Sequence, residues 1–219
     1  MSPVSVAVKN WRRLKRVDFL EMDILPLYDG LPKARQLRQV LTALSNGALA
    51  IIPTDTNYAA ICSLGCKKGI KNLYALKTGR HEKKITLLCA DLKDISLYAN
   101  VNNSAYRMMK NLLPGPYTFI LSASRLVPKM VLTKRRTVGV RIPDHPACLT
   151  ITADLGTALL AVSVKEFSNQ GDSLLALENA FQNEVSYLFD AGSVDSESSS
   201  IIDLTGSEYE IVRQGKGKI

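Results

Sequence analysis

Hydroxyl, carboxylate and phenol groups follow a short apolar run at residues 51–58. Ile51 and Ile52 predict the end of a buried strand, and Pro53 breaks the run before the polar residues Thr-Asp-Thr-Asn-Tyr at 54–58. Ligands in open α/β sheets sit beyond the carboxyl ends of strands, so this loop can hold a nucleotide or a small acid. An ordinary turn at the end of a strand is the alternative interpretation of the same residues.

Further hydroxyls and cations stand near the ends of other predicted elements. They are Lys77, Arg80, Thr118, Arg141, Ser163, Ser199, Ser200 and Arg213. Arginine holds phosphate or carboxylate in a fork, lysine acts as a mobile charge, and hydroxyls fill the remaining acceptor sites. If these residues converge, they suit a triphosphate and a carboxylate, and adenylyl transfer by positioning and charge neutralisation needs neither histidine nor cysteine. Taken singly, each arginine is also consistent with an exposed charge.

Several common catalytic motifs are absent from the sequence. It contains no Gly-x-x-x-x-Gly-Lys-Ser/Thr loop, no dinucleotide-binding glycine pattern, no zinc-binding histidine pair and no Gly-x-Ser-x-Gly elbow. A hydrolase triad would have to use His81 or His145, the 2 histidines of the chain. The sequence therefore favours chemistry by cations and hydroxyls.

Composition indicates one globular domain with an affinity for polyanions. The chain has 219 residues, 46% of them hydrophobic, and a formal net charge of +8. Lysine and arginine crowd residues 67–84 against the single acid Glu82, which favours ATP or RNA, although a solvated face is the simpler alternative. The 4 cysteines lack metal-binding spacing, and apolar neighbours suggest that three of them are buried, which fits a reducing cytoplasm.

The expected organisation is a basic tail and lead-in at residues 1–32 followed by a single domain at 33–217. No apolar run approaches the roughly 20 residues of a membrane helix, so no membrane partner is expected. We predict a cytoplasmic location, and organellar targeting by the basic N-terminus is the alternative.

Hydrophobic periodicity predicts an α/β protein in which helices separate most strands of a twisted mixed sheet. The predicted helices are 33–45, 67–77, 91–99, 104–113, 147–155 and 174–181. The predicted strands are 48–52, 58–63, 85–89, 117–123, 138–142, 158–164, 187–190, 201–204 and 208–212. Residues 215–219 are expected to be frayed.

The polar segments together resemble the YrdC/YciO superfamily. The resemblance rests on Pro53-Thr54-Asp55-Thr56-x-Tyr58, Lys77, Leu113-Pro114-Gly115-Pro116-Tyr117-Thr118-Phe119-Ile120-Leu121, Val138-Gly139-Val140-Arg141-Ile142-Pro143, Ser163, Ser199-Ser200-Ile201-Ile202-Asp203-Leu204-Thr205 and Arg213-Gln214-Gly215. It covers residues 33–217 and is closest to the YciO branch. It implies an open twisted mixed sheet flanked by helices, the YrdC-like (DHBP-synthase-like) fold, with a basic concave cavity.

For the YrdC branch, the resemblance implies a nucleotidyltransferase that makes threonylcarbamoyl-AMP. L-threonine, bicarbonate and ATP would give threonylcarbamoyl-adenylate and pyrophosphate for the t6A modification of tRNA. On that model the catalytic residues are Lys77, Arg80 and Ser163. The threonine and bicarbonate pocket is Thr54, Thr56, Tyr58, Thr118 and Arg141. Lys77, Thr86, Lys165, Ser199, Ser200 and Arg213 address ATP, and Mg²⁺ comes with the ATP phosphates rather than from a protein metal site.

Two segments depart from the YrdC branch, and they keep other functions open. The branch has Lys-x-Arg where this chain has Lys77-Thr78-Gly79-Arg80, and Ser-x-Asn where it has Ser163-Val164-Lys165. Asparagine donates and accepts hydrogen bonds, whereas lysine only donates. A YciO-type protein that binds double-stranded RNA or tRNA, with weak or no synthase activity, is the main alternative. A related transfer reaction on another substrate is the third hypothesis.

Overall fold

A computed structural model describes residues 22–76, 85–164, 173–194 and 197–219 of the chain. Its helices are α2 (Ala34–Ser45), α3 (Lys67–Ala75), α4 (Leu92–Tyr98), α5 (Asn103–Leu112), α6 (Pro146–Leu155) and α7 (Leu174–Phe181). Its strands are β1 (Asp23–Pro26), β2 (Ala50–Ile52), β3 (Ala59–Ser63), β4 (Thr86–Leu88), β5 (Tyr117–Ser122), β6 (Thr137–Arg141), β7 (Leu159–Ser163), β8 (Tyr187–Asp190), β9 (Ser200–Asp203) and β10 (Glu210–Arg213). The predicted elements are therefore present, with ends that differ by a few residues.

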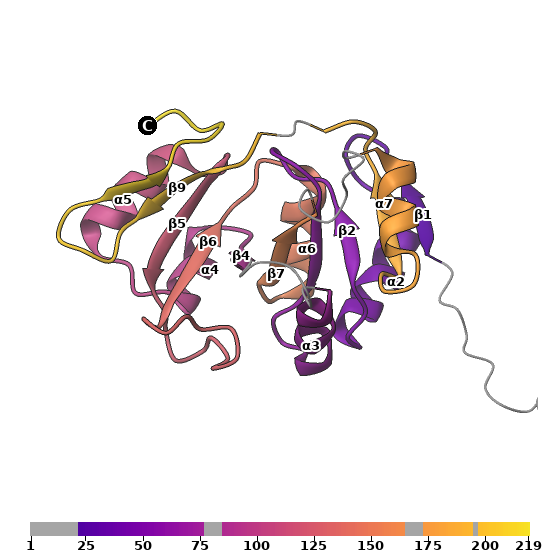
Figure 1. Cartoon of the computed structure of the whole chain (residues 1–219), viewed down its shortest axis with the longest axis horizontal. Helices are drawn as coiled ribbons and strands as arrows, with labels where there is room; N and C mark the ends of the chain where they lie inside the picture. The colour runs from indigo at the N-terminus through magenta and orange to yellow at the C-terminus, as the bar shows by residue number, and fades with distance from the viewer. Residues whose placement is uncertain (1–21, 77–84, 165–172, 195–196) are drawn as a thin grey trace, which may run out of the picture.

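The strands form one open mixed sheet in the order β1-β8-β2-β3-β7-β4-β6-β5-β9-β10. Four neighbouring pairs are parallel (β1 with β8, β2 with β8, β4 with β6, β5 with β9), and the others are antiparallel. The labelled strands follow one another across the molecule from β1 to β9, with helices beside them (Figure 1). The predicted α/β fold with an open, helix-flanked mixed sheet is confirmed.

Alternation along the strands divides the core between the two faces of the sheet. The larger cluster includes Leu87, Phe119, Val140 and Leu160 together with residues of α3, α4, α5 and α7. The smaller cluster includes Ile52, Ile61 and Leu159, which pack with Val40 of α2 and Ile151 of α6. Residues that alternate with the larger cluster along these strands therefore face away from it.

Residues 22–32 and residues 214–219 are more ordered than the sequence suggested. Within the expected lead-in, β1 pairs in parallel with β8, and Leu25 is buried in the smaller core cluster. The expectation that residues 215–219 are frayed is wrong. Their backbone is hydrogen-bonded to residues 198–200 and to Tyr117, contacts between residues far apart in the sequence that no local pattern reveals.

Three of the four cysteines, Cys62, Cys89 and Cys148, are buried as predicted. Among the helices that the structure describes, none has the length and apolar content that a membrane span requires.

Candidate functional site

The loop between β2 and β3 is folded around the hydroxyl of Thr54. This hydroxyl donates to the carbonyl of Asn57 at 2.6 Å and accepts from the backbone N–H groups of Thr56 and Asn57, each at 3.2 Å. It also lies 3.0 Å from the hydroxyl of Thr56. Either hydroxyl can be the donor in this contact. The turn-forming propensity of Ser, Thr and Asx residues explains why this sequence makes such a loop.

Arg141, the last residue of β6, reaches this loop. Its Nη1 donates to the Thr56 hydroxyl at 3.0 Å, and its Nη2 forms an ion pair with Asp55 Oδ1. The two charged side chains are only 8% and 11% exposed, respectively. Asp55 Oδ2 and Arg141 Nε have no hydrogen-bond partner in the part of the chain that the structure describes. The pair is therefore fixed in place and still has one acceptor and one donor unused.

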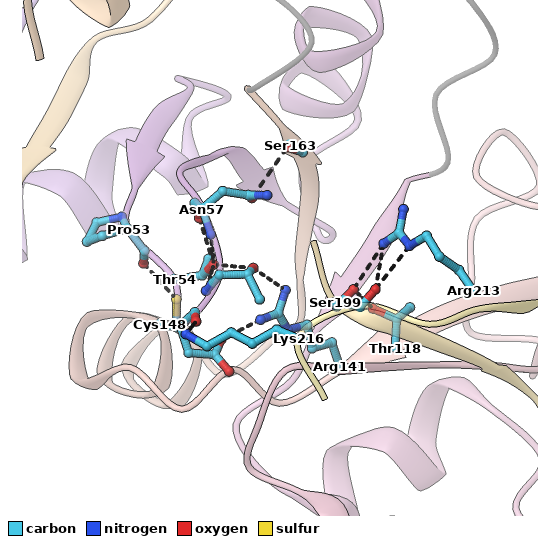
Figure 2. Close-up of polar contacts among 12 residues, drawn as sticks. Pro53, Thr54, Asn57, Thr118, Arg141, Cys148, Ser163, Ser199, Arg213 and Lys216 are labelled. Carbon is cyan, nitrogen blue, oxygen red and sulfur yellow. Dashed lines mark hydrogen bonds and ion pairs between the residues drawn. The ribbon is translucent and has the colours of Figure 1, made fainter. Parts of the chain in front are cut away.

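Ser163, at the end of β7, joins the same hydrogen-bonded group. Its hydroxyl donates to Asn57 Oδ1 at 3.3 Å, from the opposite side of the loop to Arg141 (Figure 2). We call the connected residues Thr54, Asp55, Thr56, Asn57, Arg141 and Ser163 the Asp55 group. The structure thus brings together four residues that the sequence singled out, namely Thr54, Thr56, Arg141 and Ser163.

A second set of polar residues lies at the start of β5 and β9. The hydroxyls of Thr118 and Ser199 are 2.9 Å apart, and both side chains are buried. Arg213 of β10 donates to the Ser199 carbonyl through Nε at 3.1 Å and through Nη2 at 2.8 Å. We call Thr118, Ser199 and Arg213 the Ser199 group. It contains three of the residues that the sequence singled out.

Residues 214–219, here called the C-terminal strap, pack against the Ser199 group. The Ser200 hydroxyl accepts from the Gly215 N–H at 2.9 Å and donates to the Gly217 carbonyl at 2.5 Å. The Lys216 N–H donates to the Ser198 carbonyl at 2.9 Å. Ser200, expected to bind the nucleotide, is fully buried and holds the strap instead.

Lys216 connects the two groups. Its Nζ donates to the Asp55 carbonyl at 2.8 Å. Figure 2 shows its side chain extending from the strap toward the loop that carries Thr54. Composition gave no signal for this residue, because a lysine between two glycines near a chain end is typical of a solvated tail. Asp55 and Asn57 were visible in the polar loop, but their roles as partners of Arg141 and Ser163 depend on tertiary contacts.

Small side chains lie between Arg141 and Ser163. Thr86 is paired in the sheet with Gly139 on one side and Ala161 on the other. A Cβ atom on Gly139 would stand 3.4 Å from Thr118 Cγ2 and 3.7 Å from Thr86 Oγ1. Thr86 and Thr118, both expected near the pocket, thus flank a position that carries no side chain.

Tyr58, expected in the threonine pocket, lies in the hydrophobic core. Its ring is fully buried in the larger core cluster. Its hydroxyl donates to the Gly192 carbonyl at 2.9 Å and accepts from the Ala191 N–H at 3.0 Å. These contacts tie the end of β8 to the start of β3, so Tyr58 shapes the surroundings of the Asp55 group from the core.

Neither His145 nor Cys148 offers an activated catalytic group. Burial lowers the pKa of His145, against the opposing effect of the Asp55 and Asp144 carboxylates. The neutral Nδ1 of His145 accepts from the Ala147 N–H at 3.2 Å and caps α6. Burial raises the pKa of the Cys148 thiol to about 12, and this thiol donates to the Pro53 carbonyl at 3.3 Å. In the described ranges, no cluster of three or more His, Cys, Asp or Glu residues could hold a metal ion.

Comparison with known sequences places the chain in a family. Residues 42–215 match the family Sua5_yciO_yrdC, described as telomere recombination. The chain belongs to the Sua5/YciO/YrdC family. Three residues that the sequence predicted to act in catalysis or nucleotide binding lie outside the described residues. They are Lys77, Arg80 and Lys165.

Relatives of the chain in the Sua5/YciO/YrdC family include uncharacterized proteins and threonylcarbamoyl-AMP synthases. The chain is 35% identical to an uncharacterized protein of Haemophilus influenzae, over 85% of this chain and 92% of the relative. It is 30% identical to the uncharacterized protein YciO of Escherichia coli, over 86% of this chain and 93% of the relative. It is also homologous to the human threonylcarbamoyl-AMP synthase, with 32% identity over 82% of this chain and 67% of the relative.

Solved structures of the family share the fold. The crystal structure of E. coli YciO matches with a TM-score of 0.82 and 29% identity, over 90% of this chain and 97% of that chain. The structure of P. abyssi Sua5 complexed with L-threonine matches with a TM-score of 0.78 and 22% identity, over 89% of this chain and 57% of that chain. The open sheet and its helices are therefore those of the Sua5/YciO/YrdC family.

Proposed function

We propose that the protein is a threonylcarbamoyl-AMP synthase-like nucleotidyltransferase that acts on L-threonine, bicarbonate and ATP and supplies the t6A modification of tRNA. The observation that carries the proposal is the pairing of Arg141 with Asp55 and Thr56, next to the Ser199 group. Homology to human threonylcarbamoyl-AMP synthase supports the same chemistry.

The charges beside the Asp55 group favour an anionic ligand. The hydroxyls of Thr54 and Thr56 are buried and hydrogen-bonded within the loop, and Asp55 Oδ2 is shielded from solvent, so these atoms shape the site from beneath. The charges of Arg141 and Lys216 suit a carboxylate or phosphate. L-threonine carries the first of these groups, and ATP carries the second.

The proposed reaction requires charge stabilisation and little else from the protein. The threonine amine combines with carbon dioxide from bicarbonate and loses a proton, which gives a carbamate. A carbamate oxygen then bonds to the α-phosphorus of ATP while the bond from that phosphorus to the leaving pyrophosphate breaks. Negative charge develops on phosphate oxygens, where fixed cations and hydroxyl dipoles lower the barrier.

In the proposal, Arg141, Thr56 and Ser163 position the threonine side, and Thr118, Ser199 and Arg213 position ATP. Lys77, Arg80, Thr86 and Lys165 remain proposed contributors, and Tyr58 acts through the fold. Mg²⁺ would neutralise the departing pyrophosphate, held by phosphate oxygens and water, because this ion keeps several waters and needs few protein ligands.

Pyrophosphate release tests the proposal. Purified protein is mixed with Mg²⁺, bicarbonate, L-threonine and ATP, and pyrophosphate is measured with and without threonine. We expect release that depends on threonine and falls strongly in Ser199→Ala, which removes the hydroxyl contact to Thr118. Arg125→Met, an exposed substitution outside both groups, serves as the control. Equal pyrophosphate with and without threonine would refute the proposal.

RNA binding is a second proposed function, favoured by a basic surface away from the Asp55 group. The Tyr74 hydroxyl of α3 donates to the Met130 carbonyl at 2.8 Å, which joins the helix to the β5–β6 loop. The exposed cations of these two segments are Lys67, Lys68, Lys71, Arg125, Lys129, Lys134, Arg135 and Arg136. Backbone phosphate contacts of this kind weaken with added salt. We expect affinity for double-stranded RNA to fall with salt and with Lys67→Glu plus Lys71→Glu, and not with Ser163→Ala.

A further inference from the structure

The side-chain amide of Asn57 is held in one orientation at the edge of the Asp55 group. Its Oδ1 accepts from the Ser163 hydroxyl at 3.3 Å. The backbone N–H of Asn57 donates to the Thr54 hydroxyl at 3.2 Å, and its carbonyl accepts from the same hydroxyl at 2.6 Å. Figure 2 shows the side chain extending from the loop toward Ser163. The backbone and the side chain of Asn57 are thus both fixed by the protein itself.

The sheet sets the position of Asn57 relative to Ser163. Ala59 of β3 pairs with Ser163 of β7, and the Val164 N–H donates to the Tyr58 carbonyl at 3.1 Å. The two strands are antiparallel, so the start of β3 lies beside the end of β7. Asn57 comes two residues before Ala59, where the paired strands give way to the loop. Two polar side chains therefore stand together at the end of a strand pair that holds them in place.

The amide nitrogen of Asn57 has hydrogen-bonding capacity that the described residues do not use. Nδ2 carries two donors, and the described residues accept neither of them, although the residue is only 6% exposed. The fully shielded side-chain atoms without a partner in the described ranges are Gln36 Oε1, Asp55 Oδ2 and Arg141 Nε. Nδ2 of Asn57 is not among them, so it keeps contact with solvent. A largely buried donor in this situation is satisfied by water or by a ligand.

Asn57 and Ser163 offer a donor and an acceptor side by side. The Ser163 hydroxyl gives its single proton to Asn57 Oδ1, which leaves its oxygen as an acceptor. Ser163 is partly exposed, so a ligand can reach that oxygen. A hydroxyl group matches the pair, because it accepts one hydrogen bond and donates another. A carboxylate or a phosphate only accepts, so it would face the Ser163 oxygen without a hydrogen bond.

We propose that Asn57 determines substrate specificity, because its Nδ2 donates to the side-chain hydroxyl of L-threonine, whose proton goes to the Ser163 oxygen. This inference rests on the proposed function for the identity of the amino acid. The carboxylate of the same molecule is left to the charges beside the Asp55 group, on the Arg141 side of the loop. An amino acid without a side-chain hydroxyl leaves the donor and the acceptor unpaired in the complex, and a site of this kind rejects such a ligand.

Titration calorimetry with two amino acids tests the proposal. L-2-Aminobutyrate has the carbon skeleton, the amine and the carboxylate of L-threonine and lacks only the hydroxyl. We expect the wild type to bind L-threonine about tenfold more tightly than L-2-aminobutyrate, since each buried group left unpaired weakens binding. In Asn57→Ala, the ratio of the two Kd values should fall to about twofold, because the Ser163 oxygen remains. Asn100→Ala removes an exposed amide outside both groups and should keep the wild-type ratio.

The ratio of the two Kd values separates recognition from a purely structural role. Asn57→Ala also removes the bond from Ser163, so its melting temperature should fall. A structural change alone would weaken both amino acids equally and leave their ratio at the wild-type value, and that result would overturn the proposal. If Asn57→Ala does not fold, the wild type still decides, since equal Kd values for L-threonine and L-2-aminobutyrate would overturn the proposal without any variant.

The outcomes distinguish this inference from the proposed function. A wild-type preference for L-threonine that is lost in Asn57→Ala supports the inference even when the wild type releases no pyrophosphate, which would refute the synthase activity alone. Threonine-dependent pyrophosphate release with the same ratio of Kd values in the wild type and Asn57→Ala overturns the inference and leaves the function standing. A wild type that binds neither amino acid refutes both.

Discussion

The ion pair between Arg141 and Asp55 gives the sharpest prediction for stability. Both side chains are largely buried, and Arg141 also donates to the Thr56 hydroxyl. Arg141→Met would leave the Asp55 carboxylate buried without its cation. Removing one partner of a buried pair costs about 3–5 kcal/mol, and the residual exposure of this pair places the expected loss near the lower limit, about 3 kcal/mol.

A double-mutant cycle isolates the pair from the other contacts of Arg141. Asp55→Asn keeps an oxygen that can accept from the guanidinium but removes the charge, so we expect a smaller loss of about 2 kcal/mol. The double variant Asp55→Asn plus Arg141→Met should be more stable than the sum of the two losses predicts, by about 2 kcal/mol.

Equilibrium unfolding in urea, followed by far-ultraviolet circular dichroism, measures these free energies. Arg125→Met is the matched control, because Arg125 is exposed and its loss should change stability by less than about 0.5 kcal/mol. A loss below about 1 kcal/mol for Arg141→Met, or additive single losses, would mean that the pair behaves as an exposed ion pair. The fixed geometry inferred for the Asp55 group would then be refuted.

Three further predictions concern residues around the two groups. Tyr58→Phe removes the bonds to Ala191 and Gly192, so the free energy of unfolding should fall by about 1–3 kcal/mol while the Kd for L-threonine is unchanged; a weaker Kd without loss of stability would contradict its structural role. The folded form holds His145 neutral, so stability should fall as pH drops below about 6.5, where the unfolded chain takes up the proton first. His145→Asn keeps the helix cap and should reduce this acid-induced loss of stability, which urea unfolding at a series of pH values measures. A pH profile identical to that of the wild type would contradict the prediction. Gly139→Ala should change the free energy of unfolding by less than about 1 kcal/mol. Gly139→Val adds methyl groups between Thr86 and Thr118, so calorimetry should show weaker binding of ATP or threonine. Kd values equal to those of the wild type would contradict this prediction.

Residue types and local patterns predicted most of the elements and singled out several residues of the Asp55 group. Helical spacing of Leu37, Val40, Leu41 and Leu44 located α2, and the apolar run before Pro53 located β2, because both signals are local. Local signals also marked Thr54, Thr56, Arg141 and Ser163 as polar groups at strand ends. They could not show that Asp55 is the partner of Arg141, since that pairing joins β6 to a loop 86 positions away in the sequence.

The sequence also provided no indication of β1 or of the position of Ser200, because both depend on tertiary contacts. β1 is short and lies at the edge of the sheet, where its pairing with β8 rather than its own four residues specifies a strand. Ser200 follows Ser199 in the sequence, but neighbouring side chains of a strand point to opposite faces. One serine therefore contacts Thr118 and the other holds the C-terminal strap.

The mixed directions of the strands explain how the Asp55 group forms. Leu88 of β4 pairs with Arg141, whereas Thr86 at the other end of β4 pairs with Ala161, two residues before Ser163. Arg141 and Ser163 therefore start from opposite ends of β4, since β4 is parallel to β6 and antiparallel to β7. They meet in one hydrogen-bonded group because the loop between β2 and β3 contacts both: Arg141 bonds to Asp55 and Thr56, and Ser163 bonds to Asn57. Strand direction places the two residues at opposite ends of β4, and the loop supplies the connection between them.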